Sequence, residues 1–189
     1  MKKIIIFMLL FSYYVKAQDK GILISKKNEF RVDILSAFLS SKASLSYEHF
    51  LENDFSFGLT LNYSNNQKLN EDFDNGYRNN LPKYEFIPYL RYALSKSKSR
   101  YYFAEAFASY NGGDFKEIVL LTDSNNVGYY NTQKSSYSDI ALGGSLGYKM
   151  YFHNSIAVEL LVGFGYNLTN RVKSPEILSR VGLNIGYRF

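Results

Sequence analysis

Histidine is the side chain best suited to acid–base chemistry near neutral pH, and this 189-residue chain has two, His49 and His153. A hydrolase would need one of them beside a nucleophile, at a rim that its substrate can reach. His49 shortly precedes the short polar segment Glu52–Asp54, and His153 opens another, His153–Ser155. Whether the histidines are catalytic or structural therefore depends on which end of the fold these short segments occupy.

The stretch NEDFDNG, Asn70–Gly76, offers carboxylate and amide oxygens, which are the ligands that Ca²⁺ takes in proteins. Its spacing does not match an EF-hand loop, which requires a glutamate at the twelfth position. The chain has no cysteine, so it can form neither a thiolate metal site nor a disulfide. We expect a solvated loop here, with cation binding as the alternative, and no cofactor.

Charged residues form a third set, because nine of them stand opposite the apolar face of alternating segments. They are Arg31, Asp33, Glu48, Arg91, Glu105, Asp139, Lys149, Glu159 and Arg180. An unpaired buried charge costs several kcal/mol, so this near balance of acids and bases predicts a paired internal network. The centre of the predicted network consists of Glu48, Arg91, Glu105, Lys149, Glu159 and Arg180. A catalytic acid–base pair is the alternative.

The elements that position these residues show a period of two, which is typical of strands. In FSFGLTLNY, for example, Phe55, Phe57 and Leu59 share one face, and Ser56 and Gly58 share the other. Seven further segments fit the same template. The eight predicted strands are Asn28–Phe38, Lys42–Leu51, Phe55–Tyr63, Lys83–Leu94, Arg100–Tyr110, Tyr137–Phe152, Ser155–Leu168 and Arg180–Phe189.

The connections between these strands alternate in length. Short polar turns follow every second strand, while Ser64–Pro82 and Asn111–Ser136 are long and Thr169–Glu176 is intermediate. The first hairpin is expected to turn tightly at Leu39–Ser41. Short turns at one end and longer loops at the other are typical of an outer-membrane barrel, whose short turns face the periplasm.

The N-terminal sequence MKKIIIFMLLFSYYVKAQ has the three parts of a secretory signal peptide, with a cut expected between Ala17 and Gln18. We predict a signal peptide over residues 1–17 and one barrel domain over residues 18–189. Removal of the signal peptide would lower the formal net charge from +5 to +2, because Lys2, Lys3 and Lys16 belong to it. So small a charge, on scattered residues, argues against nucleic acid as a partner.

The two faces of the strands indicate which one meets lipid. The face opposite the apolar one is rich in Gly, Ala and Ser, which suit the narrow lumen of an eight-stranded barrel. Tyrosines near strand ends suit the aromatic girdles of such a barrel. They are Tyr63, Tyr84, Tyr92, Tyr148, Tyr166 and Tyr187. We therefore predict an all-β, eight-stranded antiparallel up-and-down transmembrane barrel. An exported soluble barrel with an apolar ligand is the alternative.

The last strand, VGLNIGYRF, resembles that of small OmpA-like outer-membrane β-barrels of bacteria. In that family the chain ends on an aromatic residue preceded by alternating apolar residues, and the barrel-assembly machinery reads this terminus. The matching positions are Val181, Leu183, Ile185, Tyr187 and Phe189. More narrowly, LSYEHFLENDFSFGLTLNY resembles the second hairpin of an uncharacterised family of such barrels, in which a Tyr-Glu pair precedes the turn.

The resemblance implies a monomer in outer-membrane lipid. Because His49 and His153 adjoin short turns, which face the periplasm, both lie away from an outer-leaflet substrate. We therefore expect a non-enzymatic protein that is structural or adhesive and acts through loops 64–82 and 111–136. A lipid or peptide hydrolase and a narrow pore are the alternatives. Within Asn111–Ser136, either a recognition loop forms or the strands run on, with Ile118–Leu121 paired above the membrane. We also expect a bulge or irregular pairing at Pro88.

Overall fold

The computed structural model describes residues 26–51, 54–95, 97, 99–122, 128–153, 155–170 and 172–189. Eight antiparallel strands close into a barrel, in which each strand pairs with its neighbours in sequence and β1 pairs with β8. The strands are β1 (Asn28–Asp33), β2 (Lys42–Phe50), β3 (Phe55–Ser64), β4 (Asn80–Ala93), β5 (Arg100–Thr122), β6 (Gly128–Phe152), β7 (Ile156–Asn167) and β8 (Ile177–Arg188). The predicted eight-stranded up-and-down barrel is confirmed. The predicted signal peptide, residues 1–17, lies outside the described residues.

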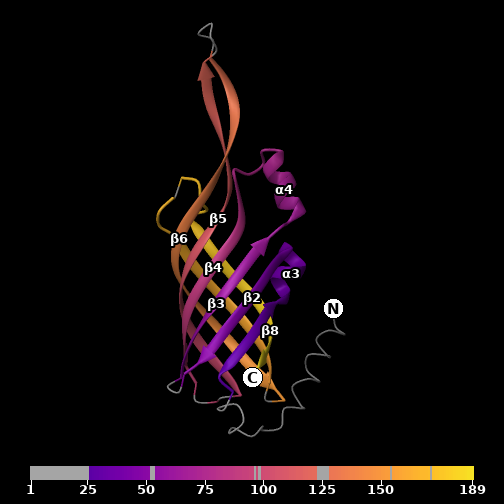
Figure 1. Cartoon of the computed structure of the whole chain (residues 1–189), viewed down its shortest axis with the longest axis vertical. Helices are drawn as coiled ribbons and strands as arrows, with labels where there is room; N and C mark the ends of the chain where they lie inside the picture. The colour runs from indigo at the N-terminus through magenta and orange to yellow at the C-terminus, as the bar shows by residue number, and fades with distance from the viewer. Residues whose placement is uncertain are drawn as a thin grey trace, which may run out of the picture.

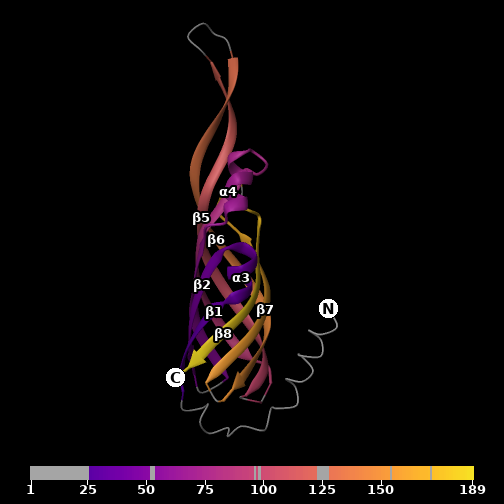
Figure 2. The ribbon, with the colours of Figure 1, turned by 90° about the vertical axis from the view of Figure 1, so that its right-hand side faces the viewer.

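Beyond the upper end of the barrel, β5 and β6 continue as a long two-stranded hairpin (Figures 1 and 2). Ile118 pairs with Thr132 and Leu121 pairs with Tyr129, so the strands run on. Of the two alternatives for 111–136, the continued strands are therefore confirmed, and a long recognition loop does not form over the described part of this range. The other predicted long loop, 64–82, contains a helix, α4 (Gln67–Asp74), beside the base of the hairpin.

β1 is shorter than the predicted strand, because the chain turns into the helix α3 (Ile34–Ser40). The Asp33 carboxylate caps this helix by accepting hydrogen bonds from the backbone N–H of Ser36 at 3.2 Å and from its hydroxyl at 2.6 Å. Ser41, with a φ of 47°, ends it in the left-handed conformation. The first connection is therefore a capped helix, and the expected tight turn at Leu39–Ser41 is wrong.

The pairing of β4 with β5 is interrupted at Ile87 and Pro88, but its register is the same before and after them. The register shifts instead between Pro82 and Tyr84. The expected irregularity at Pro88 is thus an interruption, while the bulge lies nearer the upper end of the strand.

The two faces of the wall differ as the alternation predicts. Half-exposed apolar side chains cover the outside, among them Leu45, Leu61, Leu90, Leu142, Leu146, Leu160, Val162 and Phe164. Inside, Tyr89, Phe103 and Phe107 are each at most 4% exposed. Gly147 makes room for Phe103, since a Cβ there would lie 2.3 Å from Cζ of that ring. Neither α3 nor α4, the helices of the described chain, is long and apolar enough to cross a membrane.

Candidate functional site

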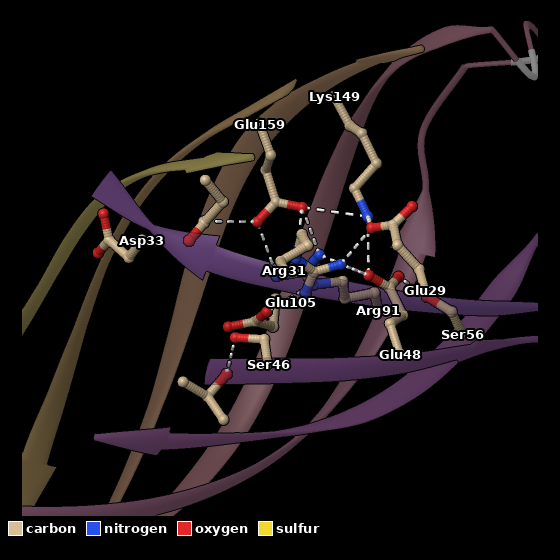
Figure 3. A network of polar contacts seen from close by, with 12 residues as sticks. Glu29, Arg31, Asp33, Ser46, Glu48, Ser56, Arg91, Glu105, Lys149 and Glu159 are labelled. Atoms are coloured by element: carbon tan, nitrogen blue, oxygen red, sulfur yellow. Dashed lines mark hydrogen bonds and ion pairs between the residues drawn. The ribbon is translucent and has the colours of Figure 1, made fainter. Parts of the chain in front are cut away.

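Eight charged side chains from seven strands meet inside the barrel, most of them drawn in Figure 3. Each is at most 9% exposed, and the set has four acids and four bases. They are Glu29, Arg31, Glu48, Arg91, Glu105, Lys149, Glu159 and Arg180. We call this set the lumen network. The formal charge of the lumen network is zero. Such a balance is expected because the barrel interior solvates isolated ions poorly.

Arg91 on β4 joins three carboxylates from three other strands. Its Nε lies 2.6 Å from Oε2 of Glu105, and its Nη1 lies 2.9 Å from Oε2 of Glu48. The same Nη1 lies 2.7 Å from Oε2 of Glu159. Phe103 packs against the guanidinium of Arg91, whose Cζ lies 4.3 Å from the centroid of the Phe103 ring. This residue therefore links the network across the lumen.

Lys149 on β6 occupies the centre of a second group of carboxylates (Figure 3). Its Nζ lies 2.8 Å from Glu29, 2.7 Å from Glu48 and 3.1 Å from Glu159. Oxygens of these three glutamates lie within 4.8 Å of one another, a spacing that could hold a metal ion. The ammonium fills that position, so the donor set fits an internal cation and not a bound metal.

Arg31 and Arg180 complete the lumen network. Arg31 Nη1 lies 2.7 Å from Glu29 and is also paired with Glu48, while its Nη2 donates to the Tyr89 hydroxyl at 2.7 Å. Arg180 pairs with Glu105. Every carboxylate of the network therefore has at least one cationic partner.

The structure brings together all six residues of the predicted network centre. Sequence reasoning missed Glu29 altogether, and it placed Arg31 on the inner face without counting it in the centre. Glu29 stands two residues before Arg31 and thus on the same face of β1, so the alternation carried the signal.

Two predicted inward charges do not join the network. Asp33 caps α3 and also accepts a hydrogen bond from the backbone N–H of Leu183 at 3.2 Å. Asp139 accepts from the Thr169 backbone N–H at 2.8 Å, from its hydroxyl at 2.6 Å and from the Asn170 backbone N–H at 2.9 Å. Both aspartates thus hold connections at the upper end of the barrel.

Both histidines lie at the lower end, beside short connections. His49 is near the end of β2, where its Nδ1 lies 2.9 Å from Oδ1 of Asn28 and its ring lies 5.3 Å from that of Phe57. His153 is in the turn after β6, with a φ of 49°. This geometry favours structural roles for both residues.

The acidic stretch 70–76 forms most of α4 and the turn after it, so the expected solvated loop is wrong. Lys134 of the hairpin donates a hydrogen bond to Asp74 at 2.9 Å. Lys116 donates to the backbone carbonyl of Asp74 at 3.0 Å, and its Nζ lies 4.7 Å above the ring of buried Phe73. Lys116 and Lys134 therefore hold the C-terminal end of α4 to the hairpin.

The predicted assembly strand forms β8 and the terminal residue. Val181, Ile185, Tyr187 and Phe189 lie on the outer face and are 42–57% exposed, and Leu183 lies on the same face. The Phe189 backbone N–H donates to the carbonyl of Asn28 at 2.8 Å, so the last residue still pairs with the start of β1.

A closed eight-stranded barrel with an apolar exterior and a charged, filled interior is the fold of small outer-membrane β-barrels of the OmpA-like kind. Among solved structures, the fold is similar to the N-terminal β-barrel domain of OprF from Pseudomonas aeruginosa, at 12% identity and a TM-score of 0.51 over 87% of this chain and 98% of that one. It is also similar to Neisserial surface protein A, at 16% identity and a TM-score of 0.51 over 86% and 92%. No protein-family model and no curated protein matches the sequence. The likeness thus concerns the fold.

Proposed function

We propose that the protein is a monomeric, non-enzymatic outer-membrane barrel with a plugged lumen, which presents its β5–β6 hairpin outside the cell for recognition. In this proposal the signal peptide, residues 1–17, is removed on export, and the barrel-assembly machinery recognises the β8 terminus. The half-exposed apolar exterior supports lipid as the surrounding medium, because a barrel in water would not cover its outer face with Leu and Phe.

The lumen network forms the proposed plug. Its side chains come from seven strands and bond across the interior, and the Glu48, Lys149 and Glu159 side chains are each at most 1% exposed. Eight strands leave an interior only wide enough to be filled by side chains. A solute would have to break several buried ion pairs to pass.

The recognition role is assigned to the β5–β6 hairpin. Above α4 no other strand of the described chain pairs with the hairpin, which exposes Ile118 (75%), Leu120 (63%) and Tyr130 (77%). Leu120 and Tyr130 are paired, and Ile118 lies two residues before Leu120, so all three share one face. Projecting segments on a rigid scaffold are where recognition usually resides, and exposed aromatic and aliphatic side chains are typical contact residues.

Attachment of cells to surfaces tests this role. Gram-negative cells displaying the protein would be compared with cells displaying a variant in which Ile118, Leu120 and Tyr130 are replaced by serine. The surfaces would be glass, a protein coat and a polysaccharide coat. The matched control replaces Asn131 and Gln133, polar residues on the opposite face of the same hairpin, by serine. Gel mobility before and after boiling would verify that each barrel is assembled.

The proposal predicts attachment by the wild type and the polar control, and its loss in the apolar variant. Attachment by wild-type cells no greater than that of cells without the protein, on all three surfaces, would contradict a recognition role. Equal attachment by the apolar variant would show that the exposed face of the hairpin is not the contact surface.

A further inference from the structure

The barrel wall is incomplete in its upper half, between β8 and β2. β1 pairs with β8 only at residues 184–188 and with β2 only at residues 45–49. Within the part of the chain that the structure describes, residues 177–183 and 42–44 therefore have no strand partner on this side. α3 contacts both β8 and β2 and lies across the gap between them (Figures 1 and 2). At Leu183 the Asp33 carboxylate accepts the backbone N–H, as a neighbouring strand would otherwise do.

A cavity of about 340 Å³ lies behind this gap. Arg91 and Arg180 of the lumen network border it at one end, and Leu69 of α4 borders it at the other. Its volume falls within the range of small-molecule sites. The plug thus closes the lumen below the cavity, and the cavity opens toward the upper end.

The cavity also borders the edge of β8 at the gap. Its lining includes Gly182 and Asn184, which lie on the inner face of β8, and Ser179 and Val181, which lie on the outer face. Ser179 is exposed and Val181 is 54% exposed. Residues of both faces of β8 thus border the cavity, which places it against the edge of β8 that no described strand covers.

The cavity wall is rich in hydroxyl and amide groups, and its cations already have partners. Arg78 donates to the backbone carbonyl of Asn80 at 2.6 Å, and Lys83 lies 2.5 Å from Asp114. Ser36, Ser44, Ser46, Thr60, Ser64 and Ser179 line the cavity. Lys42 lies 2.7 Å from Glu85, and Asn62 donates its amide hydrogen to the same carboxylate at 2.5 Å. Oδ1 of Asn62 is buried and has no partner among the described residues. Such a wall suits an uncharged ligand with many hydroxyls, which both donates and accepts hydrogen bonds.

The gap lies in the half of the barrel that faces the outer leaflet in the proposed orientation. Backbone groups without strand partners are tolerated at membrane depth only where they line a hydrated cavity or are buried in protein. On α3, Phe38 is 84% exposed and Leu39 is 73% exposed, which favours contact with lipid chains over contact with water. A polar cavity therefore adjoins an apolar rim.

We propose that this cavity binds the uncharged, sugar-like headgroup of an outer-leaflet amphiphile, which enters sideways between β2 and β8. The headgroup bonds to the hydroxyl-lined wall near Ser44 and Asn62, and the acyl chains remain in lipid beside Phe38 and Leu39. The inference uses the proposed outer-membrane location, but neither the plug nor the hairpin.

Nuclear magnetic resonance in phosphatidylcholine nanodiscs tests the inference. The probe is monoglucosyl diacylglycerol, and the readouts are the amide shifts of Ser44 and Asn62 and the through-space contacts from sugar protons to those amides. Free glucose and phosphatidic acid serve as separate arms. The blocking variant is Ser44→Phe, and the matched control is Ala43→Phe, the same change on the outer face of the same strand.

We expect contacts with the glycolipid, a loss of affinity of at least about tenfold in Ser44→Phe, and little change in Ala43→Phe. An equal response to free glucose would overturn the sideways route, and a response to phosphatidic acid alone would overturn the headgroup chemistry. If Ser44→Phe does not assemble, Asn62→Leu replaces it with the same expectation. A chain that does not insert contradicts the proposed location, whereas an inserted barrel without sugar contacts overturns the cavity proposal alone.

Discussion

Lys149 and Glu29, which stand 120 residues apart in the chain, form an ion pair inside the barrel, with Nζ 2.8 Å from Oε1. Both side chains are fully buried. They belong to β6 and β1, which are not neighbours in the wall, so the bond runs across the lumen. Such contacts across the interior are what distinguishes a plugged barrel from one lined by charges.

Arg91→Ala should destabilise the barrel strongly. The change removes the cation shared by Glu48, Glu105 and Glu159 and leaves the buried network with one uncompensated negative charge. Removal of one partner from a buried ion pair costs about 3–5 kcal/mol, and we expect the free energy of unfolding to fall by that amount. Urea unfolding in lipid vesicles, followed by circular dichroism, measures it.

The matched control for this variant is Lys134→Ala, which removes an exposed ion pair with Asp74. Exposed pairs contribute at most about 1 kcal/mol, so the control should unfold almost as the wild type does. Similar stability of Arg91→Ala and the wild type would mean that the lumen network does not hold the barrel together.

Gly147→Ala should also destabilise the barrel, because its Cβ would lie 2.3 Å from Cζ of Phe103 and 2.6 Å from the backbone oxygen of Leu160. Overpacking of this kind costs about 1–3 kcal/mol. Gly144→Ala on the same strand is the control, since its nearest neighbour would be the Glu105 carbonyl oxygen at 3.4 Å. The same unfolding measurement applies, and equal effects of the two variants would argue against a tightly filled lumen.

Deletion of Phe189 should sharply lower the amount of assembled protein in cells, while Phe189→Tyr should be tolerated. The terminal ring is 47% exposed on the outer face and stacks on Phe30 at 5.8 Å between centroids. Gel mobility before and after boiling, on membranes from cells with equal synthesis, measures assembly. Normal assembly without Phe189 would show that the terminal ring is not part of the assembly signal.

The attachment of α4 to the hairpin should weaken in acid. The hydrogen bond from Lys134 lowers the pKa of the Asp74 carboxyl below its ordinary value of 3.8. Because the pKa is lowered in the folded state, the attraction is present above about pH 4 and is lost as the pH falls through the lowered value. Amide hydrogen exchange across α4, corrected for intrinsic rates, should show this loss of protection.

Asp74→Asn should abolish this acid response, because it removes the titrating group, whereas Asp72→Asn on the same helix should retain it. An unchanged acid response in Asp74→Asn would show that the titration of another group weakens the attachment of α4 to the hairpin.

The strands and their faces could be predicted from the sequence because alternation is a local property that the barrel preserves. Glu48 and Glu159 were recognisable as inward residues in the same way. The helix α3 could not be predicted in this way, because the apolar residues of its sequence ILSAFLS also fit a strand. The helix forms instead because the Asp33 carboxylate caps it through hydrogen bonds to Ser36. The partners within the lumen network depend on strand tilt and side-chain reach, which no single segment encodes.

Planar-bilayer recording on the purified wild-type protein tests the plugged lumen most directly. The buried network, with Arg91 bonded to Glu48, Glu105 and Glu159, predicts that the inserted barrel passes no steady current under an applied voltage. Insertion would be verified on the same preparation by gel mobility before and after boiling. Stable single-channel conductance of the inserted wild-type barrel would contradict the plug and would identify the protein as a narrow pore.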